Sequence, residues 1–151
     1  LLVLVQDNSE YGEFARSVLA HIFCYAGQLL GTITTNPQDI DDAMKLGFNW
    51  QRGPFEMIDA IGGENLHRLI GDAGLTMPSA LQSGKPFYQV NEGIVSVRDS
   101  DRGYVPISLP EGSFRLQILR RALPVLSQNN DASFYLIDDN MRLVEFHSKA
   151  K

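Results

Sequence analysis

The sequence predicts a mainly α protein, a helical bundle with a small β-hairpin region in its C-terminal half, and three observations lead to this prediction. Apolar residues recur with helical spacing along residues 9–30. Three shorter helical patterns follow as far as residue 76, separated by glycine and proline. After residue 76 the pattern changes to short strand-like runs and polar turn clusters. We therefore expect a helical domain over 1–76, a linker and β-hairpin extension over 77–128, and a third region over 129–151.

Composition and charge narrow the class of protein. The chain has 151 residues, of which 44% are hydrophobic and 21% charged, as in ordinary soluble domains. The net charge is −5 and there is no basic run, which argues against nucleic acid as a partner. The most apolar long stretch, Val18–Leu30, is too short and too polar to cross a membrane. Cys24 is the single cysteine, so no internal disulfide can form, and we expect a cytoplasmic protein.

The strongest predicted helix covers Ser9–Leu30. Ser9 is a suitable N-cap, and Gly31 is a suitable stop. We expect one wide apolar stripe to be buried and Cys24 to lie off it. The stripe consists of Phe14, Ala15, Val18, Leu19, Ile22, Phe23, Ala26, Leu29 and Leu30.

Three shorter helices are predicted after it. The first of them begins at Asn36, with Pro37 at the first helical position, and ends at Gly47. The next covers residues 53–62, and the last covers 64–74. Their apolar faces are Ile40, Ala43 and Met44, then Phe55, Ile58 and Ile61, then Leu66, Leu69 and Ile70.

The C-terminal half is predicted to contain strands, turns and one short helix. Pro106 indicates an edge strand in the strand-like residues 87–109, because proline cannot donate to a sheet. Residues 133–146 are a hairpin candidate with Asp139 and Asn140 at the turn. A short helix is expected over 113–126 and a linker over 127–131, with turn clusters at 91–93 and 99–103.

Acidic residues offer two candidate metal sites, and neither is favoured. Asp39, Asp41 and Asp42 could form a carboxylate pair, but neighbouring positions on a helix point about 100° apart. Stabilisation of the helix dipole explains all three acids. The residues 99–103, DSDRG, resemble a calcium loop, yet the glycine comes one place early, so a polar hairpin turn is favoured.

Histidines and aromatic residues were also weighed as site residues. His21, His67 and His147 have no metal-ligand partner three or four positions away, so a structural or solvated role is favoured. No nucleotide-binding glycine motif is present in the sequence. Phe48, Trp50 and Phe55 either fill a corner between two helices or line a pocket that stacks on a flat ligand such as an acyl-CoA. Without convergent polar groups, the packing corner is favoured.

The segment of residues 39–62, DIDDAMKLGFNWQRGPFEMIDAIG, resembles the C-terminal helical domain of the 3-hydroxyacyl-CoA dehydrogenase family. The resemblance implies a bundle like the C-terminal domain of 6-phosphogluconate dehydrogenase, and a packing role for this corner. Asp59 is expected to accept a bond from a backbone N–H in the corner. The residues that carry the resemblance are Asp39, Ala43, Met44, Gly47, Phe48, Gly53, Pro54, Phe55 and Asp59.

The tail, residues 125–151, resembles the junction into an enoyl-CoA hydratase (crotonase-like) domain. Together the two resemblances imply a piece of a bifunctional protein of fatty-acid β-oxidation, which oxidises 3-hydroxyacyl-CoA with NAD. Lys149 and Ala150 align with a segment that lies near the CoA adenine in crotonases. The implied partners are the protein's own NAD-binding and hydratase domains, the acyl-CoA substrate and a second copy in a homodimer.

The resemblance places the chemistry outside this chain. In the family, NAD and the catalytic histidine belong to a preceding domain, whereas the helical domain closes over the substrate and mediates dimerisation. We therefore expect no catalytic, cofactor-binding or metal-binding residue within 1–151, and an inactive isolated piece. The alternative is a non-catalytic helical interaction module whose apolar stripe over Phe14–Leu30 packs against another copy or domain.

Overall fold

The computed structural model of the chain describes residues 1–92, 94–107, 116 and 122–147, and these form two compact units. The first unit contains Leu1–Gln89 and Ser96–Pro106, and the second contains Val90–Val95 and the described residues from Ile107 onward. The helices are α1 (Leu2–Gln6), α2 (Glu10–Leu29), α3 (Pro37–Phe48), α4 (Pro54–Ile61), α5 (Gly63–Asp72) and the 3₁₀ turn η1 (Ser79–Leu81). The strands are β1 (Tyr88–Asn91), β2 (Ile94–Asp99), β3 (Gly103–Pro106), β4 (Val125–Gln128), β5 (Ala132–Leu136) and β6 (Arg142–Phe146).

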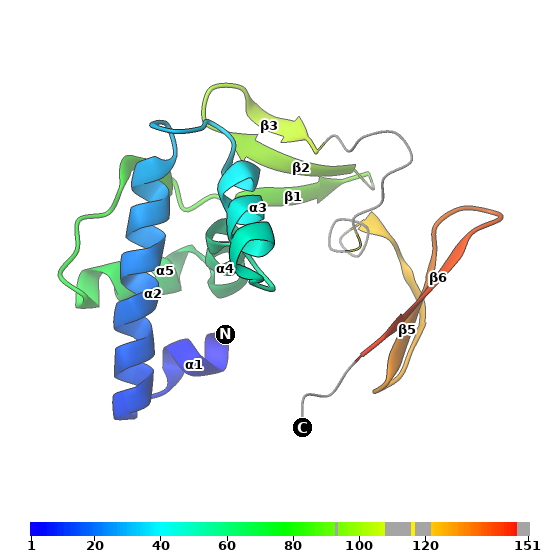
Figure 1. Cartoon of the computed structure of the whole chain (residues 1–151), viewed down its shortest axis with the longest axis horizontal. Coiled ribbons are helices and arrows are strands. Elements are labelled where there is room, and N and C mark those ends of the chain that lie inside the picture. The colour runs from blue at the N-terminus through cyan, green and yellow to red at the C-terminus, as the bar shows by residue number, and fades with distance from the viewer. Residues whose placement is uncertain (93, 108–115, 117–121, 148–151) are drawn as a thin grey trace. The chain divides into compact units, whose positions relative to one another are not determined.

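The prediction of a mainly α helical bundle was wrong, because the chain also forms two three-stranded antiparallel sheets. One sheet has the order β1-β2-β3 and the other the order β4-β5-β6 (Figure 1). Each strand is only four to six residues long, so the alternation of apolar and polar residues along it gives a weaker signal than the helical periodicity of residues 9–74. The fold is therefore a mixture of helices and sheets.

The core of the first unit lies between the helices and the first strand. Helix α2 packs against α1, α4, α5 and η1, and α4 also packs against α3 and α5. The predicted apolar faces of α4 and α5 are confirmed as buried. Burial of each large apolar side chain contributes roughly 1.5–3 kcal/mol to stability. The largest fully buried apolar side chains are Phe23, Phe55, Phe87, Leu66, Leu69, Ile70 and Leu81.

Helix α2 forms as predicted, and most of the predicted stripe is buried or half-buried, including Phe23, Ala26 and Leu30, but two residues in its N-terminal half are exposed. Phe14 is 71% exposed and Val18 40% exposed, although both belong to the predicted buried stripe. Cys24, predicted to lie off the stripe, is buried. The reason is close packing by small residues: a Cβ on Gly27 would lie 2.8 Å from Leu81 Cγ. The close approach of the α2 backbone to its neighbours, rather than the burial of the largest apolar area, determines which residues of α2 face the core.

The predicted helix starts are confirmed, and one predicted stop is wrong. Ser9 Oγ accepts from Gly12 N at 3.2 Å, and Asn36 Oδ1 accepts from Gln38 N at 3.0 Å. Helix α3 does not end at Gly47, because it continues to Phe48 and is closed by Asn49 in the left-handed region, with φ 56°. Gly47 therefore lies in the last turn of α3 and does not end it.

The C-terminal predictions divide in the same way. The hairpin over 133–146 is confirmed as β5 paired with β6, and Pro106 ends the edge strand β3. The linker predicted over 127–131 is partly wrong, since Ser127 and Gln128 belong to β4. Most of the helix predicted over 113–126 lies outside the described residues. Among the helices that the structure describes, none has the length and apolar character needed to span a membrane.

Candidate functional site

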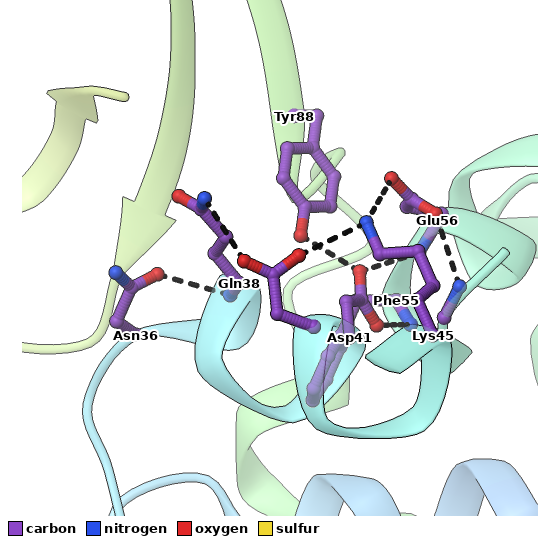
Figure 2. Close-up of polar contacts among 9 residues, drawn as sticks. Asn36, Gln38, Asp41, Lys45, Phe55, Glu56 and Tyr88 are labelled. Carbon is purple, nitrogen blue, oxygen red and sulfur yellow. Dashed lines mark hydrogen bonds and ion pairs between the residues drawn. The ribbon is translucent and has the colours of Figure 1, made fainter. Parts of the chain in front are cut away.

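Asp41 is a buried carboxylate at the centre of the motif region (Figure 2). Its side chain leaves α3 with no exposed surface and accepts from the backbone N–H of Phe55 at 2.8 Å and of Glu56 at 3.1 Å. The hydroxyl of Tyr88 donates a third hydrogen bond at 2.7 Å. The N-cap of α4 is Gly53, which has no side chain to bond these amides. Asp41 therefore caps α4 from a neighbouring helix and connects α3, α4 and β1.

A second polar layer lies beside Asp41 and involves Lys45 (Figure 2). Lys45 Nζ lies 3.2 Å from Asp42 Oδ1 and 3.1 Å from Glu56 Oε1. The other carboxylate oxygen of Glu56 accepts from Gly53 N at 3.0 Å, as the third residue of a helix does in a capping box. The first turn of α4 is thus bonded on both sides, by its own glutamate and by an aspartate from α3.

The position of Asp41 sets its protonation. Burial raises the pKa of Asp41 from 3.8 to about 7, and the negative charge of Glu56 acts in the same direction. Hydrogen bonds from Tyr88 and Phe55, and the positive charge of Lys45, oppose this rise in pKa. The Asp41 carboxyl consequently titrates near neutral pH.

Gly53 is required by the approach of Asp41. A Cβ built on Gly53 would overlap the Cβ, Cγ and Oδ1 atoms of Asp41. Pro54 follows at the first helical position, where a missing N–H costs nothing. Phe55 is fully buried, and its ring centroid lies 4.5 Å from that of Phe87. The Gly-Pro-Phe sequence therefore packs a helix start against a buried carboxylate and an aromatic core.

Asp59 bonds backbone amides, as the sequence led us to expect, but the amides belong to the segment that begins β1 and not to the corner. Asp59 Oδ1 accepts from Phe87 N, and Oδ2 accepts from Tyr88 N, both at 2.8 Å. The guanidinium of Arg98 lies 4.3 Å above the Phe87 ring. Two aspartates, from α3 and α4, thus hold the same end of β1.

The structure does not bring the other candidate site residues together. The three acids of α3 do not converge: Asp39 accepts from Thr34 Oγ1 at 2.6 Å, and Asp42 pairs with Lys45. Stabilisation of α3's own dipole does not explain Asp41, which caps α4. Phe48 is 71% exposed, so the expectation that it fills the corner with Phe55 was wrong. Its place in the helix directs it away from the core.

Among the described residues, no group of three His, Cys, Asp or Glu side chains is placed to hold a metal ion. His21 and His67 are exposed, and His147 Nε2 lies 2.9 Å from Ser133 Oγ. The DSDRG segment is confirmed as the polar turn between β2 and β3. A hydrogen bond from Arg102 leads the effects that lower the pKa of Asp99 to about 2, with further bonds from Thr35 and backbone amides.

A groove of about 670 Å³ opens on the first unit, and of the three aromatic residues considered as pocket walls only Trp50 lines it. Trp50, Gln51 and Arg52, from the loop between α3 and α4, contribute its polar groups and one aromatic wall. No residue spacing in the sequence signals this groove, because α1, α2 and the loop meet only in the fold. Its lining consists of Leu1, Leu4, Leu19, Ile22, Trp50, Gln51, Arg52 and Met57.

Comparison with known proteins identifies the motif region. Residues 12–83 match the family model of the 3-hydroxyacyl-CoA dehydrogenase, C-terminal domain. This range includes Asp41, Gly53 and Asp59, whereas Tyr88 lies just beyond it. The bonded corner is therefore mostly contained in the matched domain.

Two curated relatives extend the comparison. A probable 3-hydroxyacyl-CoA dehydrogenase of Bacillus subtilis (strain 168) is 33% identical over 152 residues, which cover 97% of this chain and 19% of that protein. A putative fatty acid oxidation complex trifunctional enzyme of Rickettsia prowazekii (strain Madrid E) is 35% identical over 72 residues, or 48% of this chain and 10% of that protein. The chain thus spans about a fifth or less of the length of these relatives. No solved structure matches the chain.

The contact between Gly53 and Asp41 predicts opposite effects for two glycine substitutions. Gly53→Ala forces a methyl group into Asp41 and should lower the free energy of unfolding by about 2–4 kcal/mol. Gly47→Ala places its methyl group in open space within a helix and should raise it by about 0.5–1 kcal/mol. Urea unfolding of both variants measures this, and a Gly53→Ala variant as stable as the wild type would contradict the assigned contact.

The raised pKa of Asp41 predicts a pH dependence of stability. The folded chain holds this proton more tightly than the unfolded chain between pH 3.8 and about 7. Protonation of Asp41 therefore stabilises the folded chain fully below pH 3.8, and this stabilisation is lost as the pH rises through about 7. The free energy of unfolding changes by at most about 1.4 kcal/mol per pH unit. Asp41→Asn does not titrate, so the stability difference between wild type and variant should shrink from about pH 5 to about pH 8.

Asp99 provides the control for this measurement. Its pKa is lowered to about 2, so its contribution is present above pH 3.8 and is lost as pH falls through the folded value. The stability difference between wild type and Asp99→Asn should stay constant from about pH 5 to about pH 8. A constant difference for Asp41→Asn as well would show that the Asp41 carboxyl does not titrate in that range.

Proposed function

We propose that this chain is the scaffold part of a 3-hydroxyacyl-CoA dehydrogenase, because residues 12–83 match the C-terminal domain family of these enzymes. The proposed enzyme oxidises 3-hydroxyacyl-CoA to 3-oxoacyl-CoA in fatty-acid β-oxidation and passes the hydride to NAD. The match of residues 12–83 to the family carries this proposal. The names of the two relatives agree with it.

The bonding of the motif residues supports a scaffold role. Asp41 and Asp59 direct their oxygens at backbone amides of α4 and of the start of β1. Phe55 is buried, and the space that a side chain at Gly53 would need is occupied by Asp41. A catalytic acid or base needs a path to substrate, whereas Asp41 is fully buried and both oxygens of Asp59 are bonded to backbone amides. In this proposal, NAD and the catalytic histidine belong to parts of a cytoplasmic protein outside residues 1–151, and a hydratase activity follows them.

A second candidate function is an interaction module, and the outer face of α2 favours it. The exposed fractions are 85% for Tyr11, 71% for Phe14, 40% for Val18 and 63% for Tyr25. Positions 11, 14, 18 and 25 follow the spacing of a single helical stripe. Large apolar side chains gathered on one helix face are typical of interaction surfaces. We propose that this stripe packs against the same stripe of a second copy of the chain in a homodimer.

The scaffold proposal predicts where activity resides. The protein encoded by the full reading frame should reduce NAD when supplied with a 3-hydroxyacyl-CoA, because it would combine the scaffold with the groups that transfer the hydride. The chain of residues 1–151 alone should give no turnover above background. The assay follows NADH formation for both proteins. Turnover by residues 1–151 at a comparable rate, or none by the full-length protein, would overturn the proposal.

The outer face of α2 predicts self-association. Light scattering should give the mass of a dimer at high concentration, because dimer formation removes the stripe from water. Phe14→Glu combined with Val18→Glu should return the chain to a monomer. Leu46→Glu, at an 82% exposed position on α3, should leave the dimer intact. A monomer at every concentration of the wild type would exclude the homodimer.

A further inference from the structure

We propose that the groove bounded by α1, α2 and the α3–α4 loop binds a long-chain carboxylate, with the alkyl chain in the groove and the carboxylate on Arg52. The inference concerns a site separate from the bonded corner and stands independently of the proposed dehydrogenase function. It follows from three features: the apolar lining of the groove, the positive charge of Arg52, and the absence of Asp and Glu from the lining.

The groove has the size and surface of a ligand site. Its volume of about 670 Å³ falls within the usual range for small-molecule pockets. Six of its eight lining side chains are apolar, and they come from helices α1, α2 and α4 and from Trp50 in the loop. All of them belong to the first compact unit. Such walls favour an alkyl chain, because each buried methylene strengthens binding about fourfold.

Arg52 supplies the charge that defines the head group. It is exposed, and it forms no hydrogen bond or ion pair with any residue that the structure describes. Lys45 and Arg102, by contrast, are paired with carboxylates. A guanidinium can hold a carboxylate through two parallel hydrogen bonds, and Gln51 beside it offers a further donor. No acidic side chain lines the groove to compete for Arg52.

These features select a free carboxylate over a thioester. The carbonyl of a thioester carries no charge, so with an acyl-CoA Arg52 could pair only with the distant phosphates of the CoA, and the dodecanoyl-CoA titration tests that arrangement. A neutral alcohol of the same chain length would occupy the walls but would lose the ion pair. The expected ligand is therefore an amphiphile with one small negative head group and an unbranched apolar tail.

Trp50 makes the site directly observable. It is the single tryptophan of the chain and is half-buried in the groove wall. Titration of the whole chain with decanoate and dodecanoate should change Trp50 fluorescence saturably, and the longer acid should bind more tightly. Dodecanol should bind at least about tenfold more weakly than dodecanoate, the usual loss for a missing charge-assisted bond.

Variants of Arg52 separate the ion pair from simple apolar binding. Arg52→Glu and Arg52→Gln should weaken dodecanoate binding about tenfold or more and leave dodecanol binding unchanged. Arg68→Glu is the matched control, because Arg68 is exposed on α5 and bonds Asn65 away from the groove. Equal affinity of wild type and Arg52→Glu for dodecanoate, or no saturable signal in the wild type, would overturn the proposal. Tighter binding of dodecanoyl-CoA that survives Arg52→Glu would also overturn it.

Discussion

A helix whose N-cap is a glycine, and a buried carboxylate from a neighbouring helix that accepts from its first-turn amides, form the constraint on which the first unit depends. The N-cap of α4 is Gly53, and the side chain of Asp41 packs so close to it that no other residue fits there. Asp41 in turn bonds two first-turn amides of α4 and the hydroxyl of Tyr88. Three segments that are distant in sequence are therefore joined at one carboxylate. The cost of burying this group appears as its raised pKa.

The polar groups of the corner bond to the backbone, which supports the proposed scaffold role of the motif. Asp41 organises the start of α4, and Asp59 organises the start of β1. Between them, Phe55 packs against Phe87 in the core, with the two rings tilted by 54°. Rigid elements of this kind position neighbouring parts of an enzyme more accurately than loops do. The outer face of α2 and the groove beside Trp50 are the surfaces proposed for a partner and a ligand.

Local signals in the sequence predicted most of the helices, and contacts between distant residues account for what was missed. Ser9, Asn36 and Pro54 mark helix starts through their own chemistry, and the structure bears them out. Asp41 looks like a helix-dipole residue until Tyr88, 47 positions away, reaches it. The buried face of α2 and the short strands likewise depend on tertiary packing, which periodicity does not register. Arg52 carries no sequence signal because its setting comes from three separate elements.

Amide hydrogen exchange tests most directly the claim that Asp41 caps α4. First-turn amides have no partner within their own helix and normally exchange quickly. If Asp41 caps α4, the amides of Phe55 and Glu56 should be protected nearly as well as the interior of α4. The first-turn amides of α5, which no side chain caps, should exchange rapidly and serve as the internal reference. Equally rapid exchange at the starts of both helices would contradict the account.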